Sequence, residues 1–183
     1  MYLNEHTMKG IFKILLILIS TLGYSQSKPE FEVFREVIGR EISSVGLYIQ
    51  CAKPKTFFDP RDFTNQTGLD VPSNILIEIE KNANESNDGF WKSKLISELK
   101  YGSDFIKSKK CLSHEDVERL FKKTGKRQSV VSISEPIFDI NYENCVVSVT
   151  YGKYTESAYG YSYFLKKVYG VWTIIITYEP WIT

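Results

Sequence analysis

The chain has 183 residues, of which 43% are hydrophobic and 25% are charged, and its formal net charge is +1 at pH 7. This length suits a single domain with a sizeable core. The near-neutral balance argues against bulk nucleic-acid binding, which requires many basic residues that neutralise phosphates.

The first 25 residues have the three parts of a secretory signal peptide. Two lysines form a positive start, and residues 14–19 are an unbroken apolar run. Gly23 and Ser25 are the small residues that a signal peptidase requires beside its cleavage site. The apolar run is well short of the roughly 20 residues of a membrane-spanning helix. We therefore expect cleavage after Ser25, which leaves residues 26–183 as one exported domain, periplasmic or extracellular, with no membrane anchor.

The exported domain contains three cysteines, Cys51, Cys111 and Cys145, and one histidine, His114. Export permits a disulfide, but the sequence leaves open whether two cysteines pair or all three are buried thiols. Their spacing matches no metal motif. A single histidine excludes a multi-histidine metal site, so we expect no metal and no cofactor.

Hydrophobic spacing predicts helices in the first two thirds of this domain. Apolar residues recur at helical spacing over residues 30–42. The pattern over residues 73–83 is ambiguous, but the preceding Pro72 favours a helix. Residues 45–51 are typical of a strand. Residues 54–72 are rich in Pro, Asp, Asn and Gly, and this composition predicts a long surface connection.

The clearest local signal predicts a helix over residues 112–123. Ser113 can cap the helix, and Asp116 stands three residues later, where a capping box places an acidic side chain. Gly125 follows at the position where a glycine commonly ends a helix.

After residue 127 the hydrophobic period changes to two, which is typical of strands. Four strands are predicted, over residues 129–134, 144–151, 158–166 and 171–178. Their short links carry turn-forming residues, and this favours an antiparallel meander. The last strand is expected to place Trp172, Ile174, Ile176 and Tyr178 on one face. The sequence thus predicts an α+β fold, with N-terminal helices and one strand followed by a four-stranded antiparallel β-meander at 129–183. This meander would form a curved sheet with helices on one face.

Several segments of this meander resemble uncharacterised exported proteins of Gram-negative bacteria. The segments are Ser134-Glu135-Pro136-Ile137-Phe138, Val146-Val147, residues 160–165 and Lys167-Val168-Tyr169-Gly170-Val171-Trp172. The resemblance covers roughly residues 129–183 and describes turns and core positions. It implies an exported β-meander and supplies no activity.

Three tyrosines, Tyr159, Tyr161 and Tyr163, alternate along the third predicted strand. Aromatic rings on an open sheet could bind a sugar ring or a partner protein. Alternatively, this face packs under the helices as part of the core. The sequence leaves both interpretations open, and the three tyrosines are the candidate ligand-binding residues.

A second candidate surface is basic. Residues 92–127 contain eleven Lys or Arg against five Asp or Glu. Such a face could meet an anionic glycan or an acidic protein, although solvated helix faces are the simpler explanation. The candidate partner-binding residues are Lys109, Lys110, Lys122, Lys123 and Arg127.

No residue is assigned a catalytic role. His114 and Glu118 have the spacing of a proton relay, but acidic residues in a first helical turn also favour the helix dipole. The nucleophile, phosphate-binding and metalloprotease motifs are missing. The sequence therefore predicts a non-catalytic binding or interaction module, whose partner is a protein or a glycan and not nucleic acid. Two alternatives remain: a small exported hydrolase that uses carboxylates, and an immunity-type protein that blocks a toxin through its basic face.

Overall fold

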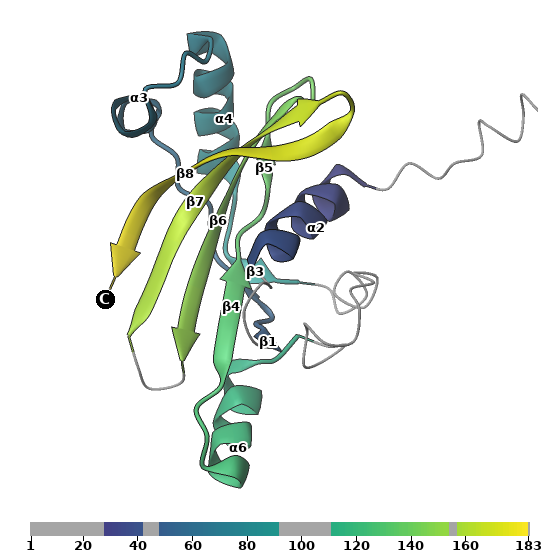
Figure 1. The fold of residues 1–183 in the computed structure, drawn as a ribbon, viewed down its shortest axis with the longest axis vertical. Coiled ribbons are helices and arrows are strands. Elements are labelled where there is room, and N and C mark those ends of the chain that lie inside the picture. The colour runs from purple at the N-terminus through teal and green to yellow at the C-terminus, as the bar shows by residue number, and fades with distance from the viewer. Residues whose placement is uncertain (1–27, 42–47, 92–110, 154–156, 183) are drawn as a thin grey trace, which may run out of the picture.

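A computed structural model describes residues 28–41, 48–91, 111–153 and 157–182. Within these residues the fold is α+β, with four helices and a six-stranded, mixed but mostly antiparallel sheet (Figure 1). The predicted signal peptide lies outside the described residues, as do Lys109 and Lys110. No helix in the described part of the chain is long and apolar enough to cross a membrane.

The strands run in the order β1-β4-β6-β7-β8, with β5 also paired to β6. All of these pairs are antiparallel except β1 with β4, which is parallel. A separate antiparallel pair, β2 with β3, lies beside this sheet. The strands are β1 (Tyr48–Ile49), β2 (Ala52–Lys53), β3 (Gly89–Phe90), β4 (Ser129–Ile133), β5 (Ile137–Phe138), β6 (Asn144–Lys153), β7 (Ala158–Val168) and β8 (Val171–Ile182).

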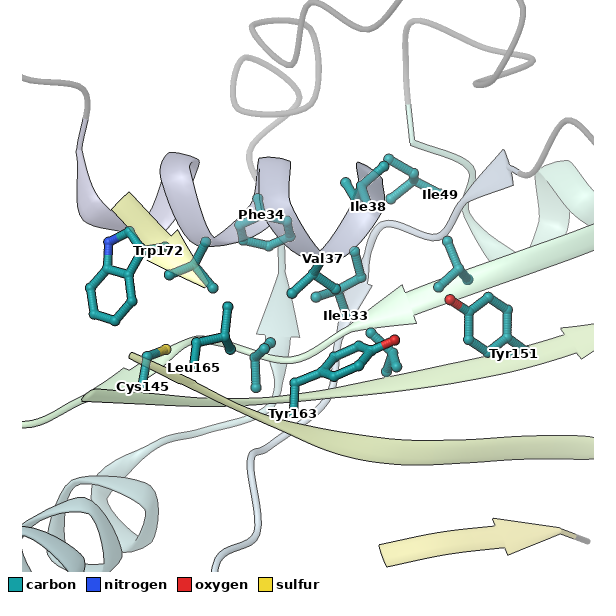
Figure 2. Close-up of a cluster of buried hydrophobic side chains, with 14 of the residues drawn as sticks. Phe34, Val37, Ile38, Ile49, Ile133, Cys145, Tyr151, Tyr163, Leu165 and Trp172 are labelled. Atoms are coloured by element: carbon teal, nitrogen blue, oxygen red, sulfur yellow. The ribbon is translucent and has the colours of Figure 1, made fainter. Parts of the chain in front are cut away.

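One face of the sheet is covered by α2 (Pro29–Glu41). The bounds of this helix agree closely with those predicted, residues 30–42. Phe34 and Val37 point from this helix towards the sheet, where Leu165 and Tyr163 point back (Figure 2). All four side chains are buried almost completely. Alternation along the strands puts these residues on one face, as the period of two predicted.

The opposite face is covered by α3 (Pro60–Thr67) and α4 (Ser73–Glu85). Val146 and Phe164 alternate with the residues under α2 and therefore point to this second face, where both are fully buried. The prediction of helices on one face is wrong, because both faces of the central strands carry apolar side chains that must be removed from water.

The helix α3 lies inside the segment that was predicted to be a surface connection. Asp59 caps it by accepting hydrogen bonds from the amides of Arg61 and Asp62, and Pro60 occupies its first turn. Gly68 ends it in the left-handed conformation, with φ of 64°. Proline at the start and glycine past the end are helix signals. The sequence therefore contained the signals for this helix, but the helix is so short that it was taken for part of the connection.

The helix α6 (His114–Thr124) confirms the predicted caps. The Ser113 hydroxyl accepts from the amide of Asp116, and the Asp116 carboxylate accepts from the amide of Ser113. Gly125 closes the helix in the left-handed conformation. These capping bonds satisfy amides that the helix itself leaves without partners.

The pairing of β8 with β7 contains a register shift that leaves Ile175 as an extra residue. One extra residue reverses the faces of the side chains that follow it. Trp172 and Ile174 consequently face α2, whereas Ile176 and Tyr178 face α3 and α4. The prediction that these four residues share a face is wrong for this reason.

A disulfide joins Cys51 to Cys111, two residues that the sequence could not pair with certainty. Backbone hydrogen bonds flank it, from the Cys51 amide to the Leu112 carbonyl and from the Leu112 amide to the Ile49 carbonyl, each 2.8 Å long. The disulfide therefore fastens the start of α6 to the end of β1. Cys145 is a buried thiol under α2, and burial raises its pKa well above the ordinary value.

Candidate functional site

A groove of about 560 Å³ lies between α4 and the segment from Glu135 to Tyr142, which includes β5 and the turn after it. One wall is a flank of α4, and the other is an apolar rim formed by three residues of that turn region. The groove residues that matter for its chemistry are Glu78, Lys81, Asn82 and Glu85 on the helix and Phe138, Ile140 and Tyr142 on the rim.

The helical period decides which residues of α4 reach the groove. Leu76, Ile79 and Ala83 are buried against the sheet at helical spacing. The polar residues on the neighbouring flank then face β5. Asn82 fixes the distance between the two walls, because its side-chain amide donates to the Phe138 carbonyl over 2.9 Å. The groove is thus a built feature of the fold.

Asp139 stabilises the turn after β5, which forms the opposite wall of the groove. It is only 2% exposed, and its carboxylate accepts hydrogen bonds from the amides of Glu143 and Asn144 and from the Asn144 side chain. The turn that it organises displays Ile140, which is 74% exposed, and Tyr142, which is 49% exposed. Tyr142 also has a left-handed backbone, with φ of 54°. Such a conformation is unfavourable for a bulky residue, so the surrounding bonds must impose it.

Five charged residues line the groove, four of them acidic and one basic: Glu78, Glu85, Glu135, Asp139 and Lys81. The carbonyl end of α4 points into this region, and the last turn of the helix contains Glu85 and no basic residue. An acidic residue at the negative end of a helix dipole is unfavourable for the helix itself. Two lysines of this chain already bind acceptors in this region: Lys53 pairs with Glu135, and the Lys55 ammonium donates to the Asn84 carbonyl over 3.2 Å. Together with Lys81, these two lysines offset three of the four acidic charges, so a small net negative charge remains at the groove.

The structure places the three predicted ligand-binding tyrosines in different environments. Tyr163 is 1% exposed and belongs to the core under α2, whereas Tyr159, at the start of β7, is 48% exposed. Tyr159 stacks on Tyr151, with ring centroids 5.1 Å apart, and Tyr161 meets Tyr163 edge to face. Much of the ring surface is thus used within the protein, and a ligand-binding role for Tyr159 and Tyr161 stays a prediction.

The basic residues of the predicted partner face are partly paired. Lys122, Lys123 and Arg127 are exposed on or just after α6. The Lys122 ammonium lies 2.7 Å from the Glu118 carboxylate, which reduces the net positive charge of this face. The Glu118 carboxylate of this ion pair is also the group that would have to exchange a proton with the exposed His114.

The hydroxyl groups of a half-buried serine on β6 and a buried serine on β7 form a short row that leads to Glu179 on β8. The Ser148 and Ser162 hydroxyls are 2.8 Å apart, and the Ser162 hydroxyl lies 3.4 Å from the Glu179 carboxylate. Burial raises the pKa of Glu179, the hydrogen bond from Ser162 opposes this shift, and the nearby negative charges of Asp62 and Asp59 add to it.

This environment predicts a pH-dependent stability that Glu179→Gln should remove. Below the ordinary pKa of 4.5, the carboxyl is protonated in both the folded and the unfolded chain. As the pH rises through the raised folded pKa, the folded protein loses stability relative to the unfolded chain. We expect Glu179→Gln to be more stable than the parent at pH 7, with the difference vanishing below about pH 4.5. Urea melts at several pH values measure this.

The matched control is Glu143→Gln, which removes a charge from an exposed glutamate in the β5–β6 turn. It should leave the pH profile of stability close to that of the parent. Equal profiles for Glu179→Gln and the parent would show that Glu179 ionises in the folded protein as it does in water.

The described residues contain no group of three or more His, Cys, Asp or Glu side chains that could hold a metal ion. No protein-family model, characterised protein or solved structure matches this chain. The resemblance to exported proteins of Gram-negative bacteria therefore stays a prediction, and the functional argument depends on the groove. This groove was not predicted from the sequence, although an acidic residue in the last turn of a helix, Glu85, is an unusual feature that could have indicated it.

Proposed function

We propose that this protein is an exported, non-catalytic binding module whose groove receives a positively charged segment of a partner protein. The observation that carries the proposal is the pairing of a helix flank that carries Glu78, Lys81 and Glu85 with an apolar rim across one groove of about 560 Å³. The signal-peptide pattern and the disulfide between Cys51 and Cys111 support export, because disulfides persist in oxidising compartments.

A lysine or arginine side chain matches both walls of this groove. Its charged head would be attracted to Glu78, Glu85 and the carbonyl end of α4. Its apolar stem, or a neighbouring apolar residue of the same segment, would lie against Ile140 and Tyr142. An aromatic rim also attracts cations through the face of its ring. In this proposal the long antiparallel strands form one curved four-stranded meander that keeps the two walls at a fixed separation.

Titration of the protein with a short lysine-rich peptide, followed by amide NMR, tests the proposal. We expect chemical-shift changes confined to residues 78–86 and 135–142. Glu85→Lys should weaken binding about tenfold, since it replaces an attraction for the basic peptide by a repulsion. Raising the salt concentration should also weaken binding, because the contact is electrostatic.

Asp70→Lys is the matched control, because Asp70 is an exposed acidic residue in the link between α3 and α4. It changes the net charge by the same amount as Glu85→Lys and should retain the parent affinity. Equal losses for both variants would mean that the peptide responds to overall charge. Shift changes scattered over the whole surface would likewise refute the groove as the site.

The hydrolase alternative has one observation in its favour, the carboxyl of Glu179 with its raised pKa beside the Ser162 hydroxyl. A raised pKa is a property that a general acid needs. Ser162 is only 4% exposed, however, and neither residue lines the groove. The binding proposal is therefore preferred.

A further inference from the structure

Two turns meet at one end of the sheet (Figure 1), and both contain exposed apolar residues. The β5–β6 turn and the β7–β8 turn are fixed to each other, because the Lys167 amide donates to the Glu143 carbonyl over 2.8 Å. Ile140 is 74% exposed, Tyr169 is 101% exposed and Val171 is 64% exposed. We name the hairpin residues Tyr169 and Val171, together with the 39% exposed Val168, the apolar tip, whereas Ile140 belongs to the rim of the groove.

The backbone at the apolar tip is not the one that its sequence would prefer. Tyr169 and Gly170 form a two-residue hairpin loop and both have positive φ, 51° and 80°. Such loops favour Asn-Gly, because asparagine adopts the left-handed conformation more readily than tyrosine does. A large aromatic ring is thus held at a strained position, fully exposed. Local rules are most often broken where a function requires it.

Lysines lie directly behind the apolar tip. Lys166 and Lys167 are both exposed, and alternation along β7 places them on opposite faces of the hairpin. The Lys167 ammonium lies over the ring of Trp172, 5.8 Å from its centroid. Glu143 is an exposed acidic residue beside them. The order of groups along the hairpin is therefore apolar at the end and basic behind it.

We propose that the apolar tip inserts into the surface of an anionic lipid bilayer. Protein interfaces typically involve roughly 20–30 residues on each side, and a tip of three side chains at the end of a hairpin is far smaller. A fluid bilayer requires no matching shape, and tyrosine is favoured at its boundary with water. The two lysines would meet anionic headgroups, which attract each basic residue near the surface. This contact is peripheral and reversible, because one tip is a weak anchor.

Co-sedimentation with vesicles of phosphatidylcholine, with and without phosphatidylglycerol, tests the inference. The parent should sediment with the vesicles that contain phosphatidylglycerol and much less with pure phosphatidylcholine. Tyr169→Asn combined with Val171→Thr should lower the partition about tenfold, since most of the inserted apolar surface is removed. Asparagine suits the left-handed position, so loss of folding would not explain this result.

Phe90→Ser is the control for the apolar tip, because Phe90 is 79% exposed on β3, away from the two turns. It should sediment like the parent. Equal sedimentation of the parent and the tip variant would overturn the inference, as would a parent that sediments without lipid, since that indicates contact between copies of the chain.

Discussion

Trp172→Ala is expected to lower the free energy of unfolding by about 3–5 kcal/mol, the range found for other buried aromatic truncations. Trp172 is 2% exposed and lies in the core under α2, with its ring centroid 5.4 Å from that of Phe138 (Figure 2). Deleting the ring would leave a cavity between the first helix and the last strand. Because a domain of this size is stable by roughly 5–15 kcal/mol, the variant should be marginally folded. Urea melts followed by circular dichroism measure the change.

Two further variants make this prediction specific. The indole nitrogen of Trp172 has no hydrogen-bond partner in the described structure, so Trp172→Phe loses ring volume but no hydrogen bond and should cost much less. Trp181 is 41% exposed and pairs with Gly160 on β7, and Trp181→Ala should also cost less. If Trp172→Ala melted like the parent, the packing of α2 on β8 would have to be wrong.

Loss of the Cys51–Cys111 disulfide should destabilise the folded state by about 4 kcal/mol. The crosslink joins residues 60 apart in sequence, and closing so long a loop restricts the unfolded chain strongly. Cys51→Ser with Cys111→Ser, or treatment of the parent with a reductant, should lower the urea midpoint by a similar amount. Thiol labelling of the unfolded parent should detect only Cys145 before reduction.

The reductant provides the control for this second prediction. It should leave the midpoint of the double variant unchanged, because Cys145 has no disulfide to lose. The parent for these melts should be purified after export and begin at Gln26. A parent that shows three labelled thiols without reduction would contradict the pairing.

Local features of the fold could be predicted from the sequence. The caps of α6 were predictable because Ser113, Asp116 and Gly125 act on backbone groups within a few residues. The alternation of β6 was predictable because Cys145, Val147, Val149 and Tyr151 recur at a period of two, although Val146 is buried on the other face. The short α3 was within reach, since Asp59 and Gly68 mark its two ends.

The remaining features depend on contacts between distant residues. The extra residue at Ile175 on β8 depends on how β7 lies beside it, and no pattern within β8 shows it. The groove forms where Asn82 meets Phe138, two residues that are 56 apart in sequence. A pattern within a single segment cannot show which helix flank will face which turn. Sequence reasoning therefore chose the tyrosines and lysines, which are conspicuous by type, and missed the groove.

The packing of α2 against β8 has a consequence for how the chain can acquire its structure during synthesis. The first helix of the domain covers a core that Trp172, near the C-terminus, completes. Until that residue has been synthesised, α2 can pack only on side chains of β4, β6 and β7, and the core beneath it lacks its last buried aromatic ring. The final packing of the first helix therefore requires nearly the whole chain, so the two ends of the domain must come together late in its synthesis.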